Sequence, residues 1–149
     1  MTSPVSFKID SPSPAVAVED AEKYLAFMEA SLRYGGLQFD LEEFIELVGS
    51  GEYLLIRVWD GDELVSVSAV EVRELVDGRD LYIVATGSTR NIPEWIGDFD
   101  TVLVQLASEA NCETITVLTR NGMGKIAKQY GYRVHQVTIR KRVKRWAVH

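Results

Sequence analysis

Residues 87–97, Gly-Ser-Thr-Arg-Asn-Ile-Pro-Glu-Trp-Ile-Gly, lie between an expected strand and an expected helix, where phosphate-binding chemistry is common. Backbone N–H groups in such a turn and the helix N-terminus bind anions, because the helix dipole favours negative charge there. This segment is poorly suited to that role, since Pro93 removes a donor and Trp95 is bulky. Carboxylates also lie just before the expected helix and at its start, where they would repel an anion: Glu94, Asp98 and Asp100. We therefore expect no standard phosphate-binding turn here.

Acid–base chemistry has three candidate general bases, Glu71, Glu74 and His135. Deprotonating an ammonium group requires a base of suitable pKa within hydrogen-bond reach. The glutamates are expected on a solvated β face and the histidine on an alternating strand, so a structural role is the favoured interpretation for all three. Trp59 and Trp95 are interpreted as packing aromatics, with capping of a cleft or contact with a partner as the alternatives for Trp95.

Net charge limits the classes of partner. The chain has 149 residues and a formal charge of −6, so nucleic acid and anionic membranes should repel the molecule as a whole. Five of the 16 basic residues nevertheless cluster near the C-terminus: Arg140, Lys141, Arg142, Lys144 and Arg145. A solvated strand end and tail is the favoured interpretation. Contact with a phosphate backbone or an acidic protein partner is the alternative.

Length and composition predict one compact domain over residues 1–149, since 46% of the residues are apolar. Residues 1–15 form a Pro/Ser-rich N-terminal segment, and residues 144–149 form a basic and aromatic tail. No apolar run approaches the roughly 18 to 20 residues of a membrane span, and the N-terminus has no apolar signal core. The single cysteine, Cys112, fits a reducing compartment and a structural role. We expect a protein that is neither secreted nor inserted in a membrane.

Hydrophobic spacing predicts the elements that position these residues. Strands are expected at Val5–Ile9, Tyr53–Trp59, Leu64–Val72, Leu81–Ala85, Thr114–Thr119 and from Val134. Helices are expected over Val18–Leu32, from an N-cap at Asp40 paired with Glu43, along Phe99–Ala110, and over Met123–Tyr130 before Gly131. The turns Asp60-Gly61 and Asp77-Gly78 make the three central strands an antiparallel meander.

This order of elements, with Gly131-Tyr132 after the last helix, resembles the GNAT (GCN5-related N-acyltransferase) fold over roughly residues 5–143. The resemblance implies an α/β (α+β) fold with a mixed central sheet of about six strands and four helices, in the order β-α-α-β-β-β-α-β-α-β. It also implies that the strands Leu81–Ala85 and Thr114–Thr119 splay apart and that an acyl-CoA lies in the opening.

The same resemblance implies the residues that an acyl-CoA would contact: Val84, Thr86, Ser88, Arg90 and Asn121. Two family features are absent. The glycine-rich turn, Arg/Gln-x-x-Gly-x-Gly/Ala, does not occur in residues 87–97. The tyrosine that in the family commonly acts as general acid and protonates the departing thiolate, four residues before Gly131, is replaced by Ala127. Tyr130 lies about 60° around the helix from the required side. No catalytic residue is therefore predicted, and Asn121 has a turn or N-cap role as its alternative.

The segment Arg120-Asn-Gly-Met-Gly-Lys125, followed by Tyr130-Gly-Tyr132, is similar to short acidic GNAT-like proteins of tailed bacteriophages. This resemblance implies a catalytically degenerate protein, without a coenzyme, that serves as a virion structural or assembly module in the host cytoplasm or the virion. Other phage proteins would be its partners, and nucleic acid is not favoured. Candidate partner contacts are Trp95, Arg140, Arg142, Lys144 and Arg145. The alternative is an acyl-CoA-dependent N-acyltransferase in which N–H groups after Ser88 replace the glycines.

Overall fold

The structure is a computed structural model, and the description covers residues 7–34, 40–89, 96–117 and 131. The chain divides into two compact units, Met1–Val117 and Leu118–His149. All elements described below belong to the first unit. In the second unit, Gly131 has a φ of 90°, the left-handed conformation that the sequence predicts for the end of a helix.

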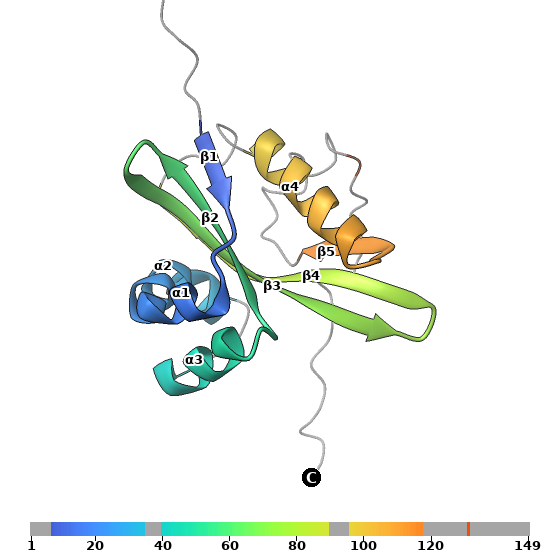
Figure 1. The fold of residues 1–149 in the computed structure, drawn as a ribbon, viewed down its shortest axis with the longest axis horizontal. Coiled ribbons are helices and arrows are strands. Elements are labelled where there is room, and N and C mark those ends of the chain that lie inside the picture. The colour runs from blue at the N-terminus through green and yellow to red at the C-terminus, as the bar shows by residue number, and fades with distance from the viewer. Residues whose placement is uncertain (1–6, 35–39, 90–95, 118–130, 132–149) are drawn as a thin grey trace, which may run out of the picture. The chain divides into compact units, whose positions relative to one another are not determined.

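A five-stranded mixed sheet forms the centre of the first unit, in the order β1-β2-β3-β4-β5 (Figure 1). Its strands are β1 Phe7–Asp10, β2 Leu54–Asp60, β3 Glu63–Leu75, β4 Gly78–Ser88 and β5 Thr114–Val117. Neighbours from β1 to β4 are antiparallel, and β5 is parallel to β4. The predicted meander is confirmed as β2, β3 and β4, and β3 and β4 are longer than the apolar pattern alone indicates.

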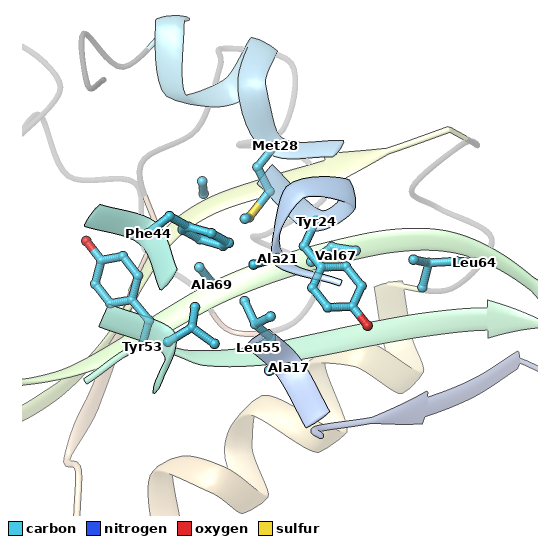
Figure 2. Close-up of a cluster of buried hydrophobic side chains, with 12 residues drawn as sticks. Ala17, Ala21, Tyr24, Met28, Phe44, Tyr53, Leu55, Leu64, Val67 and Ala69 are labelled. Atoms are coloured by element: carbon cyan, nitrogen blue, oxygen red, sulfur yellow. The ribbon is translucent and has the colours of Figure 1, made fainter. Parts of the chain in front are cut away.

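Each face of the sheet is covered by different helices, as Figure 1 shows. Alternation along the strands sends Leu55 toward one face and Ile56 toward the other. The first face packs against α1 Pro14–Glu19, α2 Ala21–Tyr34 and α3 Leu41–Gly49. Figure 2 shows this cluster, in which Tyr24, Met28 and Phe44 lie over the strands. The second face packs against α4 Ile96–Glu109 through Phe99, Leu103 and Ala107.

The helix starts follow local capping chemistry. The Asp40 carboxylate accepts a hydrogen bond from the Glu43 N–H at 2.7 Å, so the predicted start of α3 is confirmed. The prediction of one helix over Val18–Leu32 is wrong, because α1 ends at Glu19 and a new helix begins at Ala21. The separating residue, Asp20, has φ −115° and ψ 24°, outside the helical region.

The last part of the predicted order falls outside the described residues. The expected helix over Met123–Tyr130 and the expected strand from Val134 lie there, as does the end of the expected strand Thr114–Thr119 beyond Val117. Among the residues that the structure describes, no helix has the length and apolar character required to cross a membrane.

Candidate functional site

β4 lies between β3 and β5 over only part of its length. β5 pairs with β4 from Asp80↔Thr114 to Ile83↔Val117, whereas β4 continues to Ser88 beside β3. Within the described ranges, residues 84–88 of β4 therefore have a neighbouring strand on one side only. We call this segment the open β4 edge.

A bulge lies at the start of the open β4 edge. Ala69 of β3 pairs with Ala85, but the next residue, Val70, pairs with Ile83, so Val84 is an extra residue in β4. A bulge leaves its extra residue outside the ladder and bends the strand, and bulges are common beside active sites. The position at which β4 bends thus coincides with the last described pair between β4 and β5.

The register indicates where the backbone groups of the open β4 edge point. The Thr89 N–H donates to the Val65 carbonyl at 3.0 Å. Because hydrogen-bonded and non-hydrogen-bonded pairs alternate in an antiparallel ladder, Gly87 also faces β3, and Thr86 and Ser88 direct their N–H and C=O groups away from it. The backbone donor and acceptor of Thr86 thus face away from β3, on the side where an extended ligand with amide groups would pair with the strand.

The hydroxyl groups of Thr86 and Ser88 contact β3. The Thr86 hydroxyl lies 2.9 Å from that of Ser68, and the Ser88 hydroxyl donates to the Val65 carbonyl at 3.2 Å. Val84 is half-buried and packs against the cluster under α1–α3. A ligand at this edge would therefore meet the backbone of Thr86 before its hydroxyl, which lies against Ser68.

Of the residues that the resemblance implies, the structure places Val84, Thr86 and Ser88 together on the open β4 edge. The remaining candidates lie outside the described residues: Arg90, Asn121, Trp95, Arg140, Arg142, Lys144 and Arg145. Their roles stay predictions.

Helix α2 crosses β4 at Gly87. A Cβ atom at this position would overlap the backbone carbonyl of Phe27 and also approach the Met28 nitrogen at 2.9 Å. Only glycine permits this approach of helix to strand. The contact places α2 beside the open β4 edge, one residue beyond Thr86.

The N-terminus of α4 lies at the same end of the sheet as the C-terminus of β4. This follows from the parallel pairing of β4 and β5, because the connecting helix must run back between them. Asp98 lies in the first turn of α4 and is exposed. The structure thus keeps a carboxylate at the helix end where an anion would otherwise be favoured.

The two candidate bases on β3, Glu71 and Glu74, each bind a neighbouring arginine. Glu71 accepts a hydrogen bond from the Arg73 guanidinium at 2.9 Å, and that guanidinium lies 3.4 Å from the centre of the Tyr82 ring. Glu74 pairs with Arg79 at 2.8 Å. Both glutamates lie on the part of β3 that pairs with residues 79–82 of β4, away from the open β4 edge. The structural interpretation of both is supported, and His135 lies outside the described residues.

Asp80 was not singled out by the sequence analysis. It is 3% exposed, and its carboxylate accepts hydrogen bonds from the hydroxyls of Thr114 at 2.7 Å and Thr116 at 2.9 Å. These bonds join β4 to β5 at the end opposite the open β4 edge. The available signal was an aspartate directly before an apolar run, combined with alternating threonines in the next expected strand.

Cys112 follows α4 and donates its backbone N–H to the Ala107 carbonyl at 2.7 Å. Burial raises the pKa of its thiol. Since the thiolate is the reactive form, this environment supports the structural interpretation.

The comparisons with known proteins concern the fold. No family model matches the sequence, and no curated protein matches it. A predicted acetyltransferase from Clostridium acetobutylicum, solved with acetyl-CoA, superposes with a TM-score of 0.70 at 14% identity, covering 97% of this chain and 99% of that one. The chain has the fold of the GNAT acetyltransferases.

Two further GNAT-fold structures extend the likeness. A GCN5-related N-acetyltransferase from Ralstonia eutropha JMP134 has a TM-score of 0.65 at 12% identity, covering 87% of this chain and 94% of that one. An aminoglycoside acetyltransferase from an uncultured soil metagenomic sample, solved with sisomicin, has a TM-score of 0.63 at 14% identity, covering 93% and 91%. These likenesses show the fold, and none of the three structures gives support to a phage structural role.

Proposed function

We propose that this protein is an acyl-CoA-dependent N-acyltransferase that binds the thioester arm of its donor along the open β4 edge. The observation that carries this proposal is the bulge at Val84, followed by the backbone groups of Thr86, which point away from β3. An extended pantetheine chain contains amide groups, so it would add to this edge as an extra strand does. The GNAT-fold neighbours, one of them solved with acetyl-CoA, support the same class of donor.

An acyl-CoA supplies the acyl group as a thioester. Its C–S bond breaks as a C–N bond forms with an amine acceptor, the amine loses a proton, and the departing CoA thiolate takes up a proton. Backbone N–H groups beside the bulge would stabilise the negative charge that develops on the carbonyl oxygen. The edge itself, Val-Ala-Thr-Gly-Ser, contains no titratable side chain. Its contribution is therefore to orient the donor and stabilise this charge, and the proton passes to other groups or to water.

Isothermal titration of the purified protein with acetyl-CoA tests the proposal, and we expect saturable binding. The sharper variant is Thr86→Pro, because the Thr86 N–H points away from β3 and its loss removes a donor at the edge while leaving the β3–β4 ladder intact. Thr86→Val is the matched control, since it removes only the hydroxyl that contacts Ser68.

We expect Thr86→Pro to weaken acetyl-CoA binding by about tenfold, the usual cost of one well-placed hydrogen bond. Thr86→Val should bind as the wild type does. Equal affinity in all three proteins would remove the open β4 edge from the site. Absence of binding to the wild type would instead favour the scaffold interpretation. No contact among the described residues supports that interpretation by itself.

A further inference from the structure

Strand β1 lies at one end of the strand order, so among the described residues it pairs with β2 alone (Figure 1). We call its unpaired side the outer β1 edge. The strand is held firmly on its inner side. The Asp10 carboxylate accepts two hydrogen bonds of 2.7 Å from Arg57 and one of 3.3 Å from the Trp59 indole N–H. Phe7 and Ile9 pack against the cluster under α4. A strand that is fixed in this way and has an unpaired edge can pair with a further strand.

The register shows which backbone groups the outer β1 edge presents. The Leu55 carbonyl accepts a hydrogen bond from the Ser11 hydroxyl at 2.7 Å, so this carbonyl faces β1. Because facing directions alternate along a strand, Arg57 also faces β1, and its partner Asp10 faces β2. The backbone N–H and C=O of Ile9, one residue earlier, therefore point away from the sheet and toward any added strand.

The outer β1 edge is complementary to itself in charge. When two copies pair antiparallel with Ile9 opposite Ile9, the exposed Lys8 of each copy lies opposite Asp10 of the other. These two residues form a non-hydrogen-bonded pair, in which the Cα atoms are about 4.5 Å apart and unlike charges attract. A slip of two residues in either direction would instead place Lys8 opposite Lys8 or Asp10 opposite Asp10, and these pairs repel. The charges thus favour one register.

We propose that the outer β1 edge pairs with the same edge of a second copy of this chain, antiparallel about Ile9, so that two five-stranded sheets join into one. Such an interface uses the same surface on both subunits and closes on itself, so it makes a dimer and not a fibre. Lys8 disfavours apolar strands of other proteins, whereas Asp10 of a second copy compensates its charge.

This dimer does not depend on the proposed function, because β1 and β5 lie at opposite ends of the strand order. An edge of four residues, Phe7–Asp10, buries less area than a standard interface. We therefore expect a dissociation constant of about 10–100 µM.

Sedimentation equilibrium of the full chain, from about 5 to 500 µM, tests the proposal across this range. We expect a monomer–dimer equilibrium for the wild type. Lys8→Glu places two carboxylates opposite each other at two symmetric positions, so it should weaken the dimer by about tenfold. Lys23→Glu is the matched control, since it makes the same charge change at an exposed lysine on α2. It should dimerise as the wild type does.

A cysteine at the centre of the register tests the alignment. In a Cys112→Ser background, Ile9→Cys places two thiols opposite each other with Cα atoms about 5.5 Å apart, within the range of a disulfide. Mild oxidation should yield a covalent dimer. Lys23→Cys in the same background is the control and should stay monomeric on a denaturing gel.

Three results would overturn the proposal. The first is a wild type that stays monomeric up to about 500 µM, well above the expected dissociation constant. The second is a dimer that Lys8→Glu leaves as tight as Lys23→Glu does, because its interface would then lie elsewhere. The third is equal cross-linking of the two cysteine variants, which would exclude the register about Ile9. Unchanged urea midpoints for Lys8→Glu and Lys23→Glu would show that a weaker dimer reflects the interface and not the fold.

Discussion

The backbone carbonyl of Phe27 on α2 lies directly against Gly87 on β4, where no side chain fits. Gly87→Ala should therefore force the helix away from the strand, and we expect a loss of about 2–3 kcal/mol in the free energy of unfolding, as for other overpacked positions. Urea denaturation measures this loss. Acetyl-CoA affinity should fall in the same variant, because α2 borders the open β4 edge.

Gly49→Ala is the control for Gly87→Ala. A Cβ at position 49 would lie 3.5 Å from Val18 Cγ1, an ordinary contact, and alanine is the better helix former at the end of α3. We expect this variant to be neutral or more stable by up to about 1 kcal/mol. Equal destabilisation by the two substitutions would show that the approach of Phe27 is not the cause.

Asp10 and Arg57 should make the protein acid-sensitive. Two parallel hydrogen bonds of 2.7 Å join them across β1 and β2. Burial raises the pKa of Asp10, but the hydrogen bonds from Arg57 and Trp59 and the positive charge of Arg57 outweigh burial, so the pKa is lowered from 3.8. The unfolded chain then binds more protons than the folded chain between the two pKa values, and stability rises with pH through that window.

We expect the stability that this carboxylate contributes to be present above about pH 4 and to be lost as pH falls through the folded pKa. Asp10→Asn should be less stable at pH 6 and should lose less stability than the wild type between pH 5 and pH 3. Urea denaturation across this range measures both. Identical pH slopes for the wild type and the variant would contradict the prediction.

Residue patterns that are local in sequence were sufficient for much of the fold. Asp60-Gly61 and Asp77-Gly78 located the meander, and Asp40 with Glu43 located α3. The approximate position of the site came from the family resemblance, not from any local chemistry. The negative charge at the start of α4 was also visible in the sequence.

Features that depend on two distant segments could not be predicted. The bulge at Val84 has no local signature, since it results from the registers of β3 and β4 together. The need for glycine at position 87 arises from Phe27, which lies far away in the chain. The pairing of Asp80 with two threonines likewise requires β5 to lie beside β4.

Tyr53 should limit stability at high pH. Burial, and next the negative charge of Glu71, raise the pKa of its hydroxyl to about 12 from an ordinary 10.0. The folded chain therefore keeps a proton that the unfolded chain releases, so stability is full below pH 10 and declines as pH rises toward 12. Tyr53→Phe should show a smaller decline over this range in urea denaturation. A decline of the same size in both proteins would assign the alkaline sensitivity to other groups.

Asp80 provides the last prediction. The hydroxyls of Thr114 and Thr116 both donate to the same carboxylate oxygen, Oδ1, in a buried position between β4 and β5. Asp80→Ala leaves both hydroxyls without this acceptor, and we expect a loss of about 2–4 kcal/mol in the free energy of unfolding. Asp80→Asn keeps a carbonyl oxygen that accepts both bonds, so its cost should be about half as large.

Urea denaturation gives the stability losses of both Asp80 variants, and hydrogen exchange of the β5 amides should increase most in Asp80→Ala. Combining Asp80→Ala with Thr114→Val and Thr116→Val should recover part of the loss, because neither partly buried hydroxyl is then left without its acceptor. Equal costs for the alanine and asparagine variants, with no recovery in the triple variant, would show that Asp80 does not hold β5 through these two bonds.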